Sequence, residues 1–339
     1  MRLLITGGYG FIGSNFVRLL LAERPGWKIV NLDLLTYAGN VENLEDVEPQ
    51  ARGAGRYRPV RADVAEAGAV ESLFGEERPE AVVHFAAESH VDRSIEDPAP
   101  FIRTNVLGTG LLLAASRRHS VGRFVQVSTD EVYGPLALDE PRRFTEDDPP
   151  QPTSPYAASK AGADQLVAAW FRTYGFPALI TRCTNNYGPF QFPEKFIPLM
   201  ITRAMQAERL PIYGDGLYVR DWIHVEDHCR GVLAALESGQ PGRMYNFAGS
   251  AERANLDVVG EILRQTGQSR SLLETVPDRP GHDRRYAIDD ARARAELGWA
   301  PRRSFEEGLA STIDWYRTHE RWWRRIVSGD YLVDRRSAV

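Results

Sequence analysis

Two neighbouring acidic side chains, Asp130 and Glu131, follow an apolar run at residues 124–127 that is typical of a buried strand. Thr129 precedes them with a hydroxyl group. Ligands of an open α/β sheet bind at the carboxyl ends of its strands, so reacting groups are expected at this position. Two carboxyl groups can act as general acid and general base when their surroundings separate their pKa values. A polar turn that ends a buried strand is the alternative interpretation.

A second pair of candidate groups is Tyr156 and Lys160, which lie four residues apart and therefore on one face of a predicted helix. A nearby ammonium group lowers the pKa of a phenol, so Tyr156 is a candidate base for a substrate hydroxyl. Taken alone, this spacing is commoner in ordinary amphipathic helices. Lysine is rare in this chain, and the three retained lysines are candidates for positions that need a compact ammonium group: Lys28, Lys160 and Lys195.

The elements that must position these groups begin with a candidate strand at residues 2–6, which runs into a glycine-rich loop and a predicted helix at residues 11–22. The glycines allow a pyrophosphate to approach the backbone amides at the helix N-terminus. After a second predicted strand, Asp33 follows Gly13 by twenty residues, where a ribose-binding acid is expected. A carboxylate there accepts hydrogen bonds from ribose hydroxyls and repels a 2′-phosphate, which favours NAD over NADP.

Strands and helices continue to alternate, which predicts an α/β fold with a doubly wound Rossmann-type parallel sheet. The predicted strands lie at residues 28–32, 57–61, 81–85 and 124–127, and the predicted helices at residues 69–74, 100–119 and 154–174. After about Ile180 the alternation ends, which indicates a smaller C-terminal α/β domain. Successive strand residues point to opposite faces, so Asp130 and Glu131 can face one ligand only if a turn or helix starts at residues 129–132.

Composition limits the classes of function. The chain has 339 residues, 43% of them apolar, and a formal net charge of -5, which argues against a nucleic-acid partner. The N-terminus lacks room for a secretory signal and no apolar run reaches membrane-spanning length, so we expect a cytoplasmic protein. Cys183 and Cys229 have no metal-binding spacing, and His224 and His228 lack a third ligand, so no metal site is expected.

The glycine motif Gly7-x-x-Gly10-x-x-Gly13, taken with Thr129 and Tyr156-x-x-x-Lys160, resembles the extended short-chain dehydrogenase/reductase family. Within this family, Thr129-Asp130-Glu131 is similar to the signature of the dTDP-glucose 4,6-dehydratases, whereas sugar epimerases of the same fold usually have small residues there. Further agreement extends over nearly the whole chain, at residues 35–40, 86–94, 185–189, 193–195, 213–216, 220–222 and 278–283. Leu34 and Thr184 depart from the family pattern, and residues 332–339 match nothing.

The resemblance implies dehydration of dTDP-glucose to dTDP-4-keto-6-deoxyglucose: oxidation at C4, loss of water across C5 and C6, and hydride return to C6 from the same NAD. Tyr156, helped by Lys160 and Thr129, would take the proton of the C4 hydroxyl. Glu131 would remove the C5 proton and Asp130 would protonate the departing C6 hydroxyl. Asp130 must then be protonated when substrate binds, and burial and the charge of Glu131 both favour this state.

The resemblance also implies two sets of binding residues. The expected NAD contacts are Gly7, Gly10, Phe11, Ile12, Gly13, Asp33, Thr36, Gly39, Asp63, Val64, Ala86, Tyr156 and Lys160. The expected nucleotide-sugar contacts are Ser89, His90, Asn186, Glu194, Lys195, Tyr213, Arg220, Asn255, Arg279 and His282. Residues 1–182 would mainly form the NAD-binding domain and residues 183–339 mainly the nucleotide-sugar-binding domain, with residues 220–248 returning to the first. A homodimer through the helices at residues 100–119 and 154–174 is expected.

Two other functions remain open at this point. A nucleotide-sugar 4-epimerase shares the oxidation step but needs no acid-base pair for elimination. A non-catalytic NAD-binding sensor or scaffold would keep the glycine loop without needing Tyr156, Lys160 or the two acids.

Overall fold

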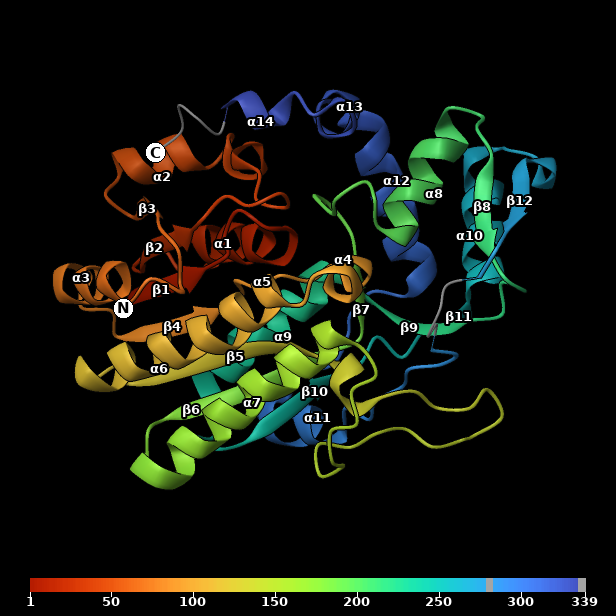
Figure 1. Ribbon diagram of the computed structural model, residues 1–339. Coiled ribbons are helices and arrows are strands. Elements are labelled where there is room, and N and C mark those ends of the chain that lie inside the picture. The colour runs from red at the N-terminus through yellow and green to blue at the C-terminus, as the bar shows by residue number, and fades with distance from the viewer. Residues whose placement is uncertain (279–282, 335–339) are drawn as a thin grey trace.

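The main element of the computed structural model, which describes residues 1–278 and 283–334, is a seven-stranded sheet. Its strand order is β10-β6-β5-β4-β1-β2-β3, and every neighbouring pair is parallel (Figure 1). The strands are β1 (Arg2–Thr6), β2 (Lys28–Asp33), β3 (Tyr57–Arg61), β4 (Ala81–His84), β5 (Arg123–Thr129), β6 (Ala178–Cys183) and β10 (Met244–Phe247). The chain starts at β1 and changes direction across the sheet at β4, so the predicted doubly wound fold is confirmed.

Helices cover both faces of this sheet, because a parallel sheet is apolar on both sides. One face is covered by α1 (Phe11–Glu23) and α9 (Val225–Ser238), and the other by α3 (Ala67–Glu77), α6 (Thr109–Arg118) and α7 (Pro155–Tyr174). Strand side chains alternate between the two cores: Leu3 and Ile5 pack on the α1 side, and Leu4 packs on the α3 side. This packing fixes the carboxyl ends of the strands along one edge.

The segment at residues 100–119 is helical, as predicted, but it is not a single α-helix. It consists of α5 (Ala99–Phe101), a π-helical segment η2 (Ile102–Gly108) and α6. The Asn105 side chain explains the irregularity, because it bonds both the N–H and the C=O of Glu88, at 2.9 and 3.0 Å, and also Ser159 Oγ at 2.8 Å. The π-helical segment thereby holds the loop that follows β4, and such segments are frequent at functional sites.

A smaller unit is formed by the later part of the chain. Its core contains Ile197, Ile201, Val258 and Trp323, which come from helices far apart in the sequence. Its helices are α8 (Phe196–Met205), α10 (Asn255–Thr266), α12 (Phe305–Thr318), α13 (Glu320–Ser328) and α14 (Tyr331–Asp334). Its strands form two small sheets, one of β7 (Asn185–Tyr187), β9 (Val219–His224) and β11 (Glu252–Ala254), the other of β8 (Leu210–Tyr213) and β12 (Leu273–Val276).

Residues 225–247 lie with the large sheet, because α9 packs against α1 and β10 pairs with β6. The remaining described elements are short: η1 (Val41–Leu44), α2 (Glu48–Gly53), α4 (Val91–Glu96), η3 (Asp130–Tyr133), η4 (Arg270–Leu272) and α11 (Ala291–Leu297). Among the helices of the described ranges, none has the length and apolar character needed to cross a membrane.

Candidate active site

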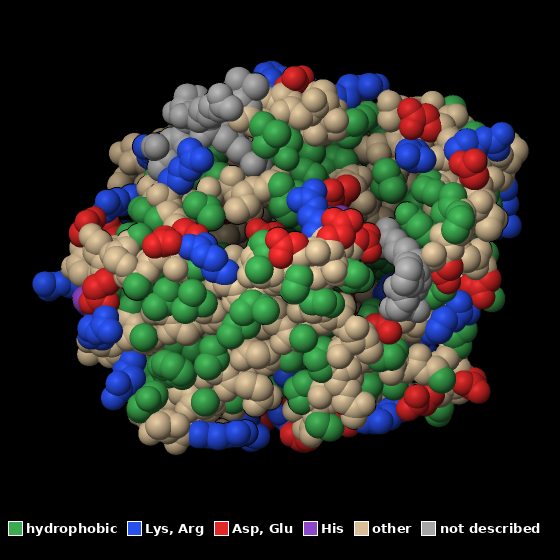
Figure 2. Space-filling model, viewed as in Figure 1, with side chains coloured by type: hydrophobic (Ala, Val, Ile, Leu, Met, Phe, Trp, Pro, Cys, Tyr) green, Lys and Arg blue, Asp and Glu red, His purple; other side chains and the backbone are tan. Residues whose placement is uncertain are grey.

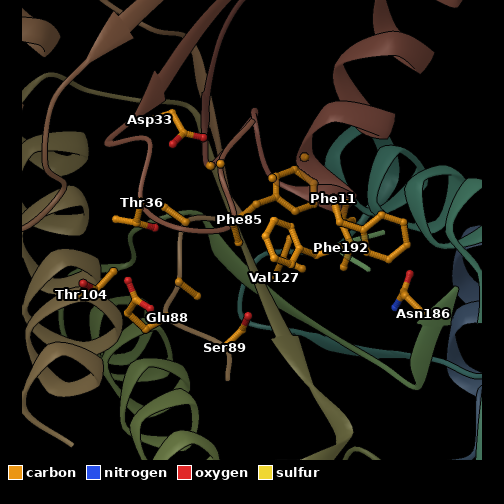
Figure 3. A pocket seen from close by; sticks show the side chains of 18 of the residues that line it. Phe11, Asp33, Thr36, Phe85, Glu88, Ser89, Thr104, Val127, Asn186 and Phe192 are labelled. Carbon is orange, nitrogen blue, oxygen red and sulfur yellow. The ribbon is translucent and has the colours of Figure 1, made fainter. Parts of the chain in front are cut away.

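A cavity of about 350 Å³ lies at the carboxyl ends of the strands of the large sheet. Residues that follow β1, β2, β3, β4, β5 and β6 all contribute to its wall. In the close-up view, Asp33 and Asn186 lie at opposite ends of the labelled side chains, with Phe11, Phe85 and Val127 between them (Figure 3). The predicted site residues that line it are Gly7, Gly10, Phe11, Ile12, Gly13, Asp33, Thr36, Gly39, Asp63, Val64, Ala86, Ser89, Thr129, Asp130, Tyr156, Lys160, Asn186 and Lys195.

The glycine loop packs so closely against the neighbouring backbone that Gly7 and Gly13 have no space for a side chain. Gly7 has a positive φ of 73°, and a Cβ added to it would lie 2.7 Å from the backbone nitrogen of Ala86. A Cβ on Gly13 would overlap the carbonyl oxygen of Gly7. Gly10 caps α1 without a side chain, so the N-terminal amides of this helix remain open toward the cavity, as phosphate binding requires.

Asp33 is fixed in the orientation that a ribose-binding acid needs. Its carboxylate accepts hydrogen bonds from the backbone N–H of Tyr9 at 2.9 Å and of Leu35 at 2.8 Å. The side chain is buried and lines the cavity. Together with the glycine loop, this acid makes the cavity a fit for NAD, because both the pyrophosphate and the ribose hydroxyls find partners of the right chemistry.

The two acids lie on a turn, as predicted. The chain leaves the extended conformation after Thr129 and forms the 3₁₀ segment η3 (Asp130–Tyr133), where the N–H of Glu131 donates to Thr129 Oγ1 at 3.3 Å. Asp130 is 3% exposed. Burial, followed by the charges of Glu131 and Asp221, raises its pKa well above the usual range of a carboxyl group. The predicted direction of this shift is therefore confirmed.

Glu131 has different neighbours from Asp130. Burial raises its pKa, while Arg220 and Lys195 act in the opposite direction. Asp130 is influenced mainly by negative charges and Glu131 mainly by positive ones, so the protonated state is favoured more strongly at Asp130. This difference in surroundings favours different protonation states for the two carboxyl groups, as a general acid and a general base require.

The expectation that Lys160 lowers the pKa of Tyr156 is wrong. Burial and the charges of Glu131, Cys183 and Asp130 raise the pKa of the Tyr156 phenol well above its usual value. Lys160 is buried as well, and its ammonium donates a hydrogen bond of 2.7 Å to the carbonyl oxygen of Val127. The hydroxyl of Thr129 acts to lower the pKa of Tyr156 in this arrangement.

Several predicted substrate contacts lie outside the cavity wall. His90 Nε2 is 3.7 Å from Glu194 Oε1, and Arg220 is near both acids and stacks 4.6 Å from the Tyr286 ring centroid. Tyr213 ends β8 and Asn255 begins α10. Arg279 and His282 lie outside the described residues. Binding roles for these residues remain predictions.

Other residues that line the cavity were not predicted from the sequence. Tyr37, Asn43, Cys183 and Trp322 all line the cavity. Trp322 lies in α13, in a stretch expected only to pack, and its indole N–H donates to Asn43 Oδ1 at 3.0 Å across 279 positions of sequence. No local pattern signals such a contact, whereas Tyr37 lies inside one of the stretches that resemble the family.

The three lysines were expected at positions that need a compact ammonium group. Lys160 and Lys195 both line the cavity, in agreement with this interpretation, whereas Lys28 is exposed at the start of β2, so the interpretation is wrong there.

His224, the N-cap of α9, and His228, within α9, take part in structural hydrogen bonds. His228 Nδ1 lies 2.9 Å from Asn186 Oδ1, and His224 accepts a hydrogen bond from the N–H of Glu226. Within residues 1–278 and 283–334, no group of three or more His, Cys, Asp or Glu side chains is placed to hold a metal ion.

The doubly wound sheet, the glycine loop with Asp33, and the Tyr156 and Lys160 pair define a dehydrogenase-like protein of the extended short-chain class. The model of the family described as GDP-mannose 4,6 dehydratase matches residues 4–312, and the chain belongs to this family.

Two close relatives support this assignment. The chain is 49% identical, over 99% of both chains, to a dTDP-glucose 4,6-dehydratase of Xanthomonas campestris pv. campestris. A solved structure of a dTDP-glucose 4,6-dehydratase of Streptomyces venezuelae with NAD bound aligns with a TM-score of 0.90 at 47% identity, covering 96% of this chain and 100% of that one. By comparison, a UDP-glucose 4-epimerase of Thermotoga maritima is 31% identical with a TM-score of 0.86, over 94% and 99% of the two chains.

Proposed function

We propose that this protein dehydrates dTDP-glucose to dTDP-4-keto-6-deoxyglucose with bound NAD. The observation that carries this proposal is the turn that bears the two acids: Asp130 lines the cofactor cavity, and Glu131, which lies outside the cavity wall, is close enough for its charge to raise the pKa of Tyr156. An epimerase has no use for two such acids. The relatives named dTDP-glucose 4,6-dehydratase are also more similar to this chain than the epimerase.

Each residue of the site has one role in this reaction. Tyr156 acts as a phenolate that accepts the proton of the C4 hydroxyl and becomes a neutral phenol, and the Thr129 hydroxyl stabilises the phenolate before the transfer. Lys160 holds the end of β5 through Val127 and supplies a positive charge within the buried site. Bound NAD supplies the hydride acceptor for C4 and the hydride donor for C6.

The two acids perform the elimination. Oxidation at C4 acidifies the C5 hydrogen, which Glu131 removes, while Asp130 donates its proton to the departing C6 hydroxyl. Burial raises the pKa of Glu131, and the charges of Arg220 and Lys195 oppose this rise and so favour the ionised form that a base needs. Asp130 remains protonated because it is buried beside negative charges.

Nucleotide-sugar binding is assigned to the residues that follow β4 and to the smaller unit. Ser89, Asn186 and Lys195 line the cavity, and Arg220 lies beside Glu131. These groups match the hydroxyl and diphosphate groups of a nucleotide sugar, for which Arg and Lys are the usual partners. Residues 1–182 thus mainly bind NAD, and residues 183–339 mainly bind the sugar nucleotide.

A homodimer is part of the proposal, because η2 and α7, before and after α6 in the chain, expose apolar side chains on one face of the molecule. Figure 2 shows apolar atoms gathered over the region of α6 and α7. Leu107 of η2 is 49% exposed, Phe171 and Tyr174 of α7 are 36% and 48% exposed, and a second cavity lies between α6 and α7. Sedimentation at micromolar concentration is expected to give twice the chain mass of 38.0 kDa.

We also place the protein in the cytoplasm, a compartment consistent with the two buried cysteines, Cys183 and Cys229, neither of which forms a disulfide.

The function is tested by incubating the purified protein with NAD and dTDP-glucose and measuring the mass of the product by mass spectrometry. We expect loss of one water molecule and a 4-keto sugar. A product of unchanged mass with inverted C4 would support an epimerase instead, and NAD binding without any turnover of nucleotide hexoses would support a sensor.

A further inference from the structure

A buried polar cluster lies against the catalytic turn and has no part in the chemistry proposed above. It consists of Ser128, Tyr133, Asp164 and Arg182, which we call the clamp cluster. Arg182 on β6 and Asp164 on α7 are each 1% exposed, and Arg182 Nε donates a hydrogen bond of 2.9 Å to Asp164 Oδ2. Neither residue lines the cofactor cavity.

This ion pair contacts the chain on both sides of the catalytic turn. Before the turn, Ser128 Oγ donates to Asp164 Oδ2 at 3.0 Å, and Ser128 is the strand neighbour of Arg182 in the β5 and β6 register. At the end of the turn, the guanidinium carbon of Arg182 lies 4.5 Å from the centroid of the Tyr133 ring. Thr129, Asp130 and Glu131 therefore lie between two points held by one ion pair.

The hydrogen bonds within the turn itself are few, and other support comes from outside it: the N–H of Gln151 donates to the carbonyl oxygen of Val132 at 2.9 Å, and the Tyr133 hydroxyl donates to Asn246 Oδ1 at 2.9 Å. The N–H of Gly134 donates to the carbonyl oxygen of Glu131 at 3.2 Å, and Glu131 donates to Thr129 Oγ1 at 3.3 Å. A single 3₁₀ turn is marginal without tertiary contacts, because its hydrogen-bond geometry is poor. The precise placement of the two acids must therefore come from outside the turn.

A buried ion pair is also an expensive way to stabilise a fold. Desolvation of both charges offsets much of their attraction, and apolar residues of the same volume often stabilise a protein equally well. The planar guanidinium, however, can bond a carboxylate along its edge and stack on a ring with its face, which an aliphatic side chain cannot do. The geometry of the clamp cluster uses both properties of Arg182.

We propose that Arg182 and Asp164 are positioning residues for the elimination step, fixing Asp130 and Glu131 relative to the sugar through Ser128 and Tyr133. This inference rests on the proposed function, since it concerns the acids that distinguish a dehydratase from an epimerase. Displacement of a reacting group by about 1 Å costs on the order of 10²-fold in rate. Elimination should therefore respond to Arg182 far more strongly than oxidation at C4, which depends on Tyr156.

The test uses the full-length protein with NAD in single turnovers of dTDP-glucose. The double variant Arg182→Met/Asp164→Asn removes both charges of the pair, so that neither is left buried without the other. Because Asp164 also acts on Lys160, and Thr129 lies on the same turn, we expect C4 oxidation to slow by less than about tenfold and elimination by about 10²-fold. The reduced nicotinamide absorbance would persist, and solvent deuterium would enter the sugar slowly.

Two further variants control for a purely structural effect. Arg182→Lys keeps the charge beside Asp164 but lacks the planar face that lies over the Tyr133 ring, so it should restore only part of the elimination rate, and it provides a measurement if the double variant fails to fold. Arg123→Met removes another arginine of the same sheet, one that bonds the carbonyl oxygens of Ala235 and Gly239, and should leave the ratio of the two steps unchanged.

Equal loss of oxidation and elimination in the Arg182 variants, or a normal ratio of the two steps, overturns the positioning role. Wild-type protein that forms no 4-keto-6-deoxy sugar overturns the proposed function itself and, with it, this inference. Wild-type turnover with a normal ratio in folded variants overturns only the role of Arg182 and Asp164.

Discussion

Asp130 is a carboxyl group that the protein keeps neutral by placing it where ionisation is costly. Its side chain is buried, and the nearest strong influences on its pKa are the negative charges of Glu131 and Asp221. A neutral carboxyl can donate a proton, whereas an ionised one cannot, so the same burial that destabilises the fold suits Asp130 to the proposed role of general acid. Two consequences of this environment can be measured.

The first consequence concerns catalysis. Replacing Asp130 with Asn removes the proton donor but keeps the shape of the side chain, so elimination should slow by about 10²- to 10⁴-fold while C4 oxidation proceeds. Single-turnover absorbance should show reduced nicotinamide that forms at the wild-type rate and then persists. Asp139→Asn, an exposed neighbour in the chain, serves as the matched control. Unimpaired formation of the 4-keto-6-deoxy product by the Asp130 variant would contradict the acid assignment.

The second consequence concerns stability against pH. The unfolded chain ionises Asp130 above a pH of about 3.9, whereas the raised pKa keeps it protonated in the folded state. The folded state then binds more protons, so this residue makes the free energy of unfolding fall as pH rises from about 3.9 through the folded-state pKa. Asp130→Asn should therefore raise the melting temperature, and by more at pH 7 than at pH 4. An equal change at both pH values would argue against the raised pKa.

At the scale of elements, the loop between β1 and α1 shows how backbone conformation limits which residue can be used. Gly7 combines a φ of 73° with a Cβ position 2.7 Å from Ala86 N, so both its conformation and its surroundings exclude a side chain. Ala86 follows β4, the strand beside β1, and also lines the cavity. The loop is therefore fixed by its own glycines and by the neighbouring strand.

Gly7→Ala should lower the free energy of unfolding by about 1–3 kcal/mol, because the added Cβ is strained in this conformation, and should weaken NAD binding. Gly75→Ala is the matched control: it lies inside α3 with no atom within 4 Å of its added Cβ, and should raise stability by about 0.5–1 kcal/mol. Thermal unfolding and NAD titration by fluorescence check both. Tight NAD binding by a stable Gly7→Ala protein would contradict the proposed role of the loop.

At the scale of the whole molecule, the C-terminal helices reach back to the cofactor cavity. Figure 1 shows α14 near α2 at the top of the molecule, with α13 next to α14. Tyr331 donates a hydrogen bond of 2.8 Å to the carbonyl oxygen of Tyr37, and Trp322 bonds Asn43. Tyr37, Asn43 and Trp322 line the cavity, so the end of the chain completes a wall begun near residue 37.

Trp322→Phe keeps most of the buried ring but removes the 3.0 Å hydrogen bond to Asn43. A hydrogen bond of this kind contributes about 1 kcal/mol, so NAD should dissociate about fivefold faster while C4 oxidation of bound substrate is unchanged. Stopped-flow displacement of NAD measures the rate. Trp299→Phe is the matched control: it removes a hydrogen bond of 2.9 Å from the indole N–H to the carbonyl oxygen of Asp227, outside the cavity wall, and should leave NAD release unchanged.

Much of the fold followed from local patterns. Five strands of the large sheet, β1 to β5, together with the glycine loop and the start of α1, are encoded by apolar runs and glycine spacing, and their boundaries agree with the structure to within a few residues, whereas β6 and β10 were not predicted. The turn at Asp130 was also predictable, because two adjacent strand residues cannot face the same ligand. The π-helical segment was not, since it depends on contacts of Asn105 with Glu88 and Ser159.

The sequence by itself thus determined the doubly wound sheet, the candidate acids and the choice of NAD, because each rests on residue types at short spacing. Only the tertiary structure decided which charges surround Asp130 and Tyr156, that Trp322 completes the cavity, and that Arg182 pairs with Asp164 beside the catalytic turn. The physical reason is that pKa shifts and buried contacts depend on distances between segments far apart in the chain, which spacing along the sequence does not specify.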